Sequence, residues 1–543
     1  MPSLSTADHR VSPPRIEIPR DYNAAHDLVE RNLAAGRAAK IAYIDDQGTY
    51  TYGELAERVN RCANALTVLG LQPEDRVLVC LLDTIDFPSA FLGAIKAGIV
   101  PIAANTLLMG HDYDYMLRDS RARALIVSAQ LLPTIAPILP RHPQLRHVIV
   151  SGPSAEEAGT THTLAALTAK ASVNFAAAAT TCDDACFWLY SSGSTGAPKG
   201  TVHVHSSLIQ TAELYAKPVL GIREDDVVFS AAKLFFAYGL GNALTFPMSV
   251  GATTILMAER SAPPAIIARL NKHQPTIFYG VPTLFAALLA SSELPRRGEL
   301  KLRVCTSAGE ALPAEIGRRW TERFGVEILD GLGSTEMLHI FLSNRPGQVH
   351  YATTGVPVPG YELRIVNDDG HPVAQGEVGE LQINGPTAAM GYWNNREKSR
   401  ATFQGVWTRS GDKYSIDAEG RYVYSGRSDD MLKVGGIYVS PIEVEAALIT
   451  HPAVLEAAVI GRADDEQLVK PQAYIVLKRG HAPSVALAEE LRQHVKAHLA
   501  PYKYPRWIEF IDELPKTATG KIQRFKLREL SARRPSAAGA GKP

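Results

Sequence analysis

The sequence predicts an α/β protein with a large N-terminal domain of layered α/β sheets, a β-rich subdomain and a small α+β C-terminal domain. Three observations support this fold class. Apolar strand patterns alternate with amphipathic helical patterns up to about residue 360, which is typical of mainly parallel sheets. Residues 362–426 are instead rich in glycine and in alternating apolar residues, which indicates hairpins. After Gly426 the alternation resumes over about 110 residues, the size of a small domain.

The domain boundaries follow from these changes of pattern. We expect an N-terminal domain at residues 1–428, with its β-rich part at about 362–426, and a C-terminal domain at residues 429–534. The last segment, residues 535–543, consists mostly of alanine, glycine and proline and is expected to be disordered.

The individual elements are predicted from the spacing of apolar residues. Tyr52 to Leu69 has apolar residues at helical spacing, and Arg76 to Leu81 is a continuous apolar run that indicates a buried strand. Residues 1–20 contain four prolines, among them Pro13, Pro14 and Pro19, and are expected to be loosely ordered. Further strands are expected at 42–45, 48–51, 100–102, 124–127, 148–150, 187–189, 302–305, 454–460 and 473–477, and further helices at 21–33, 91–95, 202–211, 442–449 and 486–499.

The composition argues against several functions. Lysine and arginine number 56, as do aspartate and glutamate, so the net charge of zero argues against nucleic-acid binding. The five cysteines are scattered; Cys182 and Cys186 lack a Cys/His pair with zinc spacing, so reduced thiols are expected. The first 14 residues have no apolar signal core, and no run of about 18 apolar residues predicts a membrane span. We therefore expect a cytoplasmic protein without a membrane or nucleic-acid partner, as a monomer or homodimer.

A loop rich in glycine and hydroxyl residues, Tyr190 to Gly200, stands between an expected strand and an expected helix. Glycines let backbone N–H groups approach a phosphate chain, hydroxyls donate hydrogen bonds, and Lys199 supplies positive charge. Pro198 precedes that lysine, so the loop is not a Walker A motif, and the Gly-x-Ser-x-Gly elbow is also absent from it. A flexible surface loop is the alternative interpretation.

Residues 191–200 resemble the phosphate loop of adenylate-forming enzymes, a superfamily that contains acyl- and aryl-CoA synthetases, peptide-synthetase adenylation domains and firefly luciferase. Six motifs of that superfamily follow one another in order over about residues 190–521. The resemblance implies that ATP is bound in the first motif by Ser191, Ser192, Gly193, Ser194, Thr195, Gly196 and Lys199.

Two further motifs belong to the nucleotide site by resemblance. The first, Ser307–Glu310, follows an expected strand, where small residues leave room for a flat ring. By resemblance, Ala308, Gly309 and Glu310 form the adenine side of the site. Gly331 to Glu336 is not a dinucleotide fingerprint, because Glu336 stands where the last glycine should be. The resemblance implies that Asp330, Gly331, Leu332 and Thr335 contact the nucleotide, with Thr335 at the α-phosphate, and that Glu336 holds Mg²⁺. Leu332 replaces the tyrosine usual in the family, which removes one stacking surface for adenine.

The remaining motifs place catalytic and conformational roles in the second half of the chain. By resemblance, Asp412 and Arg427 bind the ribose, and Asp429 is the hinge about which a mobile C-terminal domain turns. Lys433 with Gly435 and Gly436 would then face the incoming thiol. Lys521 would bridge the carboxylate and the α-phosphate during adenylation. Aspartate and arginine on loops are usually only solvated, so it is the order of the motifs that favours these roles.

The acid pocket is expected between Phe235–Gly239 and the loop after Glu336, because aromatic walls with small floors suit a flat ring. The residues assigned to it are Phe236, Ala237, Tyr238, Gly239, Ala308, Gly333, Leu338, His339, Ile340 and Lys521. Tyr502, Lys503 and Arg506 match the region that meets the nucleotide of coenzyme A in aryl-CoA ligases. Lys503 and Arg506 are equally well interpreted as solvated surface cations.

The whole chain is similar to benzoate–CoA ligases and, less closely, to 4-hydroxybenzoate–CoA ligases. The resemblance implies a ligase that uses ATP and Mg²⁺ to convert an aryl carboxylate into an acyl-AMP and then into a coenzyme A thioester. The alternatives are a ligase for another aryl or medium-chain acid, a luciferase-like oxidase, and a binding protein without catalytic activity.

Overall fold

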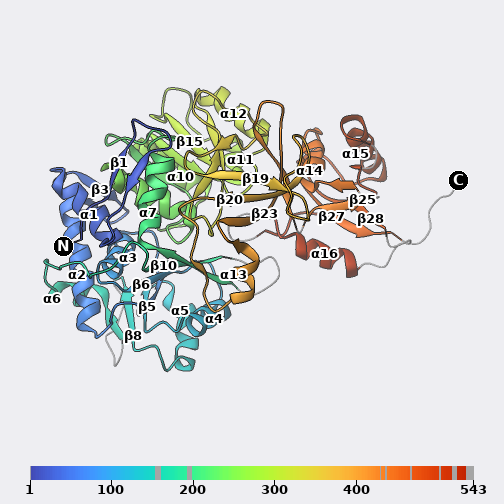
Figure 1. Ribbon diagram of the computed structural model, residues 1–543. Coiled ribbons are helices and arrows are strands. Elements are labelled where there is room, and N and C mark those ends of the chain that lie inside the picture. The colour runs from blue at the N-terminus through green and yellow to red at the C-terminus, as the bar shows by residue number, and fades with distance from the viewer. Residues whose placement is uncertain are drawn as a thin grey trace. The chain divides into compact units, whose positions relative to one another are not determined.

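The computed structural model describes residues 2–152, 161–191, 198–428, 430–434, 437–464, 468–500, 503–516 and 522–533 (Figure 1). Contacts group the chain into two compact units. Unit 1 comprises Met1–Leu363 and Gln382–Ser410, and unit 2 comprises Arg364–Leu381 and Gly411–Pro543. Both units combine helices with sheets, so the predicted α/β class is confirmed. This division cuts through residues 362–426, the β-rich segment that was predicted to lie entirely in the N-terminal domain. The domain boundary at residue 428 stays a prediction.

The first large sheet of unit 1 has a parallel centre and one antiparallel edge. Its order among the described strands is β21-β11-β10-β6-β5-β7-β8-β9. These strands are β21 (Gly391–Tyr392), β11 (Lys199–Val204), β10 (Ala185–Ser191), β6 (Val100–Ala103), β5 (Arg76–Cys80), β7 (Ala124–Ser128), β8 (His147–Ser151) and β9 (Thr161–Thr163). Strands β10, β6, β5, β7 and β8 run parallel, whereas β11 is antiparallel to both of its neighbours. The central strands are apolar on both faces because helices cover both sides.

The second large sheet of unit 1 supplies the strand ends at which a ligand is expected. Its order among the described strands is β18-β17-β16-β15-β14-β12-β13-β3-β4. These are β3 (Ile41–Ile44), β4 (Thr49–Thr51), β12 (Val227–Ser230), β13 (Thr253–Ile255), β14 (Ile277–Gly280), β15 (Val304–Ser307), β16 (Ile328–Gly333), β17 (Ile340–Ser343) and β18 (Val356–Pro357). Strands β14, β15 and β16 are parallel neighbours, so their carboxyl ends lie together at one edge.

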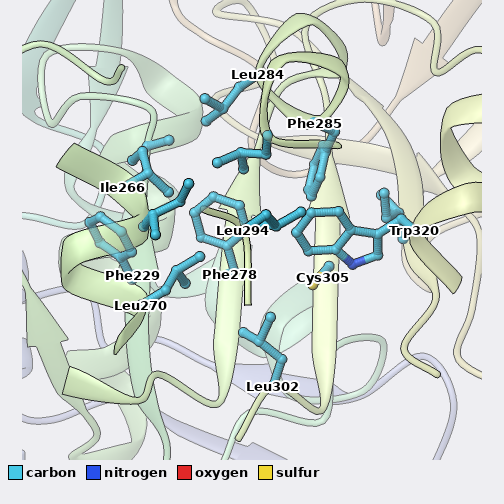
Figure 2. Close-up of a cluster of buried hydrophobic side chains, with 14 of the residues drawn as sticks. Phe229, Ile266, Leu270, Phe278, Leu284, Phe285, Leu294, Leu302, Cys305 and Trp320 are labelled. Atoms are coloured by element: carbon cyan, nitrogen blue, oxygen red, sulfur yellow. The ribbon is translucent and has the colours of Figure 1, made fainter. Parts of the chain in front are cut away.

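An aromatic core fixes this second sheet against its helices (Figure 2). Trp320 is fully buried, with ring centroids 4.8 Å from Phe285 and 4.5 Å from Phe324. Phe278 of β14 packs on the same indole. Because β14 and β15 are held from behind by these large side chains, their carboxyl ends have a rigid support.

The helices of unit 1 begin where local capping groups are available. Helix α2 starts with a capping box, in which the Thr51 hydroxyl accepts from the Glu54 N–H and the Glu54 carboxylate accepts from the Thr51 N–H. The helices are α1 (Ala24–Ala34), α2 (Tyr52–Val68), α3 (Asp86–Lys96), α4 (Gly110–Ser120), α5 (Leu132–Ile135), α6 (Leu164–Lys170), α7 (His205–Thr211), α8 (Ala237–Leu240), α9 (Phe246–Val250), α10 (Pro263–His273), α11 (Pro282–Ala290), α12 (Ala314–Phe324) and α13 (Arg396–Thr402). Two π-helical turns, Ala212–Ala216 and Gly241–Thr245, follow α7 and α8.

Two sequence-based expectations for unit 1 are wrong. Residues 202–204 belong to strand β11 rather than to a helix, because β11 pairs with β10 on one side and with β21, nearly 200 residues away in sequence, on the other. The N-terminal stretch is ordered, since strands β1 (Thr6–Asp8) and β2 (Arg15–Glu17) pair and the Ser5 hydroxyl donates to Asp27 at 2.6 Å. The first error comes from a partner distant in sequence, whereas the second comes from the pairing of two short neighbouring strands and a hydrogen bond to α1.

A five-stranded sheet contains the residues at which the two units divide. Among the described strands its order is β19-β20-β23-β22, with β24 paired to β23. The strands are β19 (Glu362–Val366), β20 (Gly379–Asn384), β22 (Phe403–Gln404), β23 (Trp407–Ile416) and β24 (Tyr422–Arg427), as the glycine-rich alternation predicted.

Unit 2 has its own apolar core, built around a three-stranded sheet. Its described elements are β25 (Leu432–Val434), β26 (Ile437–Val439), α14 (Pro441–Ile449), β27 (Val454–Ala463), β28 (Val469–Leu477), α15 (Val485–His498), β29 (Trp507–Phe510) and α16 (Arg524–Arg533). Val444, Leu448, Val459, Ile475 and Leu491 form the centre of this core. The predicted helices and strands of this region are confirmed, whereas β25, β26, β29 and α16 were not predicted.

Candidate active site

The β10–β11 hairpin places the two ends of the glycine-rich loop side by side. Ser191 and Lys199 are partners in the antiparallel register, so they close the base of the loop. Ser192, Gly193, Ser194, Thr195 and Gly196 lie outside the described residues, and their roles stay predictions.

The base of this loop meets the carboxylate of Glu336. The Ser191 hydroxyl donates to Glu336 Oε1 at 3.4 Å, and Lys199 Nζ lies 3.9 Å from the same oxygen. The Tyr392 hydroxyl donates to Glu336 Oε1 at 2.7 Å, and Lys199 Nζ lies 4.5 Å from the centre of the Tyr392 ring. The structure therefore brings two predicted phosphate-site residues to the predicted metal-binding carboxylate.

Tyr392 is a site residue that the sequence did not reveal. It lies in the two-residue strand β21, whose pairing with β11 positions it opposite Thr201. A two-residue strand carries no periodic pattern, so this pairing has no signal in the sequence. Gly391, with φ of 151°, and Asn394, with φ of 52°, show that the backbone is irregular on both sides of Tyr392.

A neutral histidine fixes the backbone of Thr335. Burial lowers the pKa of His203 to about 4, so this imidazole is uncharged near neutral pH. Its Nε2 donates to the Thr335 carbonyl oxygen at 2.8 Å, which requires the tautomer with the proton on Nε2. The Thr335–Glu336 peptide is thus anchored to β11, on the strand that follows the loop.

The predicted adenine side lies at the carboxyl ends of β15 and β16. Ala308 is buried directly after β15, Gly309 is exposed with φ of 94°, and Glu310 follows them. Asp330 of β16 pairs with Ser307 of β15 in the parallel register. Burial raises the pKa of Asp330 well above its ordinary value.

Several buried polar atoms at these strand ends have no hydrogen-bond partner among the described residues. They are Tyr279 Oη on β14, Ser307 Oγ on β15, Asp330 Oδ1 on β16 and His339 Nδ1 just before β17. Buried polar atoms are nearly always paired in proteins, so a cluster of unpaired ones indicates where water or a polar ligand completes the structure.

Tyr238 and His339 form the centre of the predicted acid pocket. Their ring centroids are 5.6 Å apart, and His339 Nε2 lies 3.2 Å from the Tyr238 carbonyl oxygen, to which it donates. Burial lowers the pKa of His339 to about 3, so the ring is neutral. The Tyr238 hydroxyl bonds to the Thr306 hydroxyl of β15, and the Phe246 ring lies 4.5 Å from the imidazole.

Small residues make this arrangement possible. A Cβ added to Gly241 would lie 2.4 Å from the His339 ring, and one added to Gly333 would lie 2.8 Å from the His339 backbone. A Cβ at Gly239 would collide with the Lys233 carbonyl. Gly239 and Gly333 were predicted site residues, whereas Gly241 was not, since a helical glycine gives no indication of what it faces.

Four other residues predicted for the pocket lie within two positions of Tyr238 or His339 in the sequence. Leu338 is buried with φ of 66°, a conformation that a non-glycine residue adopts only where its surroundings impose it. The Ile340 side chain covers Gly331, and Leu332 lies in β16. Phe236 lies against Phe235, with centroids 4.4 Å apart, and Ala237 begins α8.

Unit 2 carries the predicted ribose pair. Asp412 of β23 and Arg427 of β24 face each other across the ladder, and Arg427 Nη1 donates to Asp412 Oδ1 at 3.0 Å. The backbone of Lys433 lies in β25, opposite Tyr438. Lys503 Nζ lies 2.6 Å from both Glu443 carboxylate oxygens, and the Arg506 guanidinium lies 3.7 Å from the Tyr504 ring centre.

Five other predicted positions lie outside the described residues. They are Asp429, Gly435, Gly436, Tyr502 and Lys521. Lys516 and Ile522 pair with each other on either side of the segment that contains Lys521. No helix in the described part of the chain is long and apolar enough to cross a membrane.

Comparison with known proteins decides the family. The family model described as AMP-binding enzyme matches residues 30–393, and the one described as AMP-binding enzyme C-terminal domain matches residues 443–521. The chain belongs to the AMP-binding enzyme family. The two matched ranges contain the predicted phosphate loop, Glu336 and Lys521, as the resemblance stated above requires.

This AMP-binding enzyme has close relatives among curated proteins. It is 67% identical to the benzoate–CoA ligase of Thauera aromatica over 530 residues, which cover 97% of this chain and all of that protein. It is 52% identical to the 4-hydroxybenzoate–CoA/benzoate–CoA ligase of Rhodopseudomonas palustris, with 94% and 95% of the two chains covered.

Solved structures agree with this AMP-binding enzyme in fold. A benzoate CoA ligase from Burkholderia xenovorans LB400 superposes with a TM-score of 0.87 at 60% identity, covering 93% of this chain and 100% of that chain. The anthranilate CoA ligase AuaEII in complex with anthranoyl-AMP gives a TM-score of 0.91 at 45% identity, covering 95% and 98%.

Proposed function

We propose that this AMP-binding enzyme is an ATP-dependent benzoate–CoA ligase. The observation that carries the proposal is the segment 331–340, which joins two different sites. One end bears Glu336, held by Tyr392 and facing Lys199; the other bears His339, packed on Tyr238. The residues proposed for the phosphate site and for the aromatic pocket thus lie on one short stretch of chain.

The reaction has two steps because a carboxylate is a poor electrophile. In the first, a benzoate oxygen attacks the α-phosphorus of ATP, the bond to pyrophosphate breaks, and pyrophosphate leaves. In the second, the thiol sulfur of coenzyme A attacks the acyl carbon, the bond to AMP breaks, and the thiol proton passes to solvent. AMP is a good leaving group, so the protein needs no strong base for the second step.

The residues assigned to the first step stabilise negative charge. Lys199 and the loop before it bind the departing phosphates, and Thr335 and Lys521 contact the α-phosphate. Lys521 also orients the benzoate carboxylate. Asp412 and Arg427 hold the ribose, and Ala308 to Glu310 border the adenine.

Glu336 is suited to Mg²⁺, since its oxygen is hard and already faces the phosphate loop. Among the described residues no three His, Cys, Asp or Glu side chains gather to hold a metal by themselves. Magnesium is commonly bound by one or two carboxylates together with substrate phosphates, so a single glutamate is consistent with a magnesium site. When bound, the ion neutralises phosphate charge.

Coenzyme A is the proposed thiol substrate, because the relatives that cover nearly the whole chain are named as CoA ligases. Lys433, Gly435 and Gly436 would face the thiol. Tyr502, Lys503 and Arg506 would lie near the nucleotide of coenzyme A, for which Lys503 would exchange Glu443 for a phosphate.

A panel of acids tests the proposed function. Purified enzyme is given ATP, Mg²⁺ and benzoate, 4-hydroxybenzoate, 2-aminobenzoate, phenylacetate or octanoate, with and without coenzyme A. We expect the highest kcat/KM with benzoate and a coenzyme A-dependent release of AMP. A higher kcat/KM with 4-hydroxybenzoate than with benzoate would support the alternative of a 4-hydroxybenzoate–CoA ligase. AMP release that needs oxygen but not coenzyme A would refute the proposed CoA ligase activity.

A further inference from the structure

Unit 2 contains a chain of charged side chains that begins at the proposed ribose pair, Asp412 and Arg427. These two residues face each other across β23 and β24, with Arg427 Nη1 donating to Asp412 Oδ1. Gly411, with φ of 73°, lies beneath the guanidinium, and a Cβ there would come within 2.9 Å of Arg427 Nη2. The position of Arg427 relative to Asp412 therefore depends on how the backbone after β24 is held in place.

The turn after β24 connects Arg427 to Asp430. The backbone N–H groups of Asp430 and Met431 each donate to the Arg427 carbonyl at 3.0 Å. The Ser428 N–H donates to the Gly411 carbonyl at 2.9 Å, which ties the turn back to β23. A shift of Asp430 would therefore move Arg427 as well.

Two arginines one helical turn apart on α16 hold Asp430. Arg528 Nη2 donates to Asp430 Oδ1, and Arg524 Nη1 lies 3.7 Å from Asp430 Oδ2. Residues four apart project from the same helix face, so α16 presents both guanidinium groups to one carboxylate.

Arg524 is in turn anchored inside the fold by Glu445. Arg524 Nη2 lies 2.7 and 2.8 Å from the two Glu445 oxygens, and Glu445 Oε1 also accepts from the Val459 N–H at 2.7 Å. The exposed fractions of the two side chains are 14% and 8%. Glu445 alone would satisfy the charge of Arg524, so the further contact with Asp430 is not needed for charge balance.

We propose that Asp430 and Arg524 are positioning residues of the nucleotide site. They hold Asp430, whose N–H donates to the Arg427 carbonyl, so that Arg427 and Asp412 are already aligned before the ribose arrives. Alignment in advance improves affinity, because less order has to be created on binding. The inference rests on the proposed function, in which that pair holds the ribose.

The test separates positioning from folding. Asp430→Asn removes only the charge that α16 holds. The double variant Glu445→Leu/Arg524→Leu removes both partners of the buried pair, because removing only one would leave an unpaired buried charge. Arg524→Lys keeps the charge with a different shape. Arg492→Leu, which breaks an Arg492–Glu489 pair on α15, is the matched control.

The measurements are the AMP dissociation constant by calorimetry, the benzoate KM at saturating ATP, and the melting temperature. For Asp430→Asn and the double variant we expect about tenfold weaker AMP binding with unchanged benzoate KM. Arg524→Lys should bind AMP more tightly than these two variants do. The control Arg492→Leu should bind AMP as the wild type does.

Wild-type AMP affinity in both Asp430→Asn and the double variant would overturn the inference, whatever their melting temperatures. A parallel rise in the AMP dissociation constant and the benzoate KM would overturn it too, since it would indicate general loss of structure. A wild-type enzyme that binds AMP yet makes no thioester from any acid would refute the proposed function and leave this inference standing.

Discussion

At the scale of the residue, the candidate pocket is governed by burial without charge. His339 and Tyr238 touch through their rings and through one hydrogen bond to backbone, and neither carries a charge near neutral pH. A benzoate ring gains from such a wall through apolar contact, while its carboxylate must find charge elsewhere. The proposal gives that role to Lys521.

Lys521→Ala is expected to lose adenylation by about 100-fold or more, because one positioned donor to developing charge contributes that much. The same variant should still convert synthetic benzoyl-AMP and coenzyme A into thioester. Pyrophosphate release and thioester formation, measured separately, check this. Equal loss of both half-reactions would contradict the two-conformation mechanism.

Phe236→Ala and Tyr238→Ala are expected to raise the KM for benzoate far more than the KM for ATP, since both residues belong to the proposed acid pocket. Tyr238→Phe serves as the control, because it keeps the ring and removes only the hydroxyl bound to Thr306. Steady-state kinetics with each substrate varied in turn measure the effect. Unchanged benzoate kinetics in both alanine variants would place the pocket elsewhere.

The low pKa of His339 makes a prediction about pH. The value of about 3 in the folded chain lies below the ordinary 6.5, so the unfolded chain binds more protons between these values. Stability contributed by the neutral imidazole is therefore complete above pH 6.5 and falls as the pH drops toward 3. From pH 6 to 8.5 we expect a benzoate KM without a titration step from His339. A step near pH 6.5 that vanishes in His339→Gln would contradict this.

At the scale of the element, the carboxyl ends of β14, β15 and β16 border the candidate site, and α12 packs against these strands. Trp320 of α12 is fully buried against Phe278 and Phe285 (Figure 2). The hydroxyls of Tyr279 and Ser307, which have no hydrogen-bond partner among the described residues, stand on β14 and β15. Tyr279 projects from the face of β14 opposite to that of Phe278, so apolar packing on one face accompanies an incompletely paired polar atom on the other.

Trp320→Ala is expected to lower the free energy of unfolding by about 3–5 kcal/mol, the usual cost of deleting a buried aromatic side chain. Urea denaturation followed by circular dichroism measures it. Val68→Ala, at a position 84% exposed, should stay within about 0.5 kcal/mol of the wild type. A loss below about 1 kcal/mol in Trp320→Ala would show that the core adjusts around the gap.

The elements differ in how far the sequence could predict them. Strands such as β5 and β7 are continuous apolar runs, and the glycine-rich loop and Glu336 belong to an ordered series of motifs, so both kinds of feature were predictable. Strand β11 and the two-residue strand β21 were not predicted, and their pairing with each other joins residues about 190 positions apart. The positions of Tyr392 and Gly241 in the candidate site were not predicted either, because the tertiary fold decides which residues they contact.

At the scale of the whole molecule, each of the two units has its own buried core, around Trp320 in unit 1 and around Val459 in unit 2. The chain passes between them after Leu363, Leu381 and Ser410. Separate cores allow each unit to keep its internal structure if the two move relative to each other. Movement about residue 429 is the corresponding prediction from the sequence.

Asp429→Pro is expected to separate the half-reactions. A hinge residue must change φ and ψ, and proline fixes φ near −65°, so the variant should be held in one state. If that state is the adenylating one, benzoyl-AMP should form while thioester formation fails. Single-turnover pyrophosphate release and thioester yield on the same folded variant measure this, with Asp429→Ala as the control. Wild-type rates for both steps in Asp429→Pro would show that residue 429 does not move.

The close approach of Gly241 to His339 has a consequence for redesign of the enzyme. The imidazole occupies the space that a side chain at 241 would need, so the two positions share one volume. Substitutions at the two positions are therefore not independent, and their effects on acid preference should not add. A library that varies one position at a time would discard pairs, such as a small residue at 339 with a larger one at 241, in which each change is acceptable only beside the other. New acid specificities in this fold are more accessible when both positions are randomised together.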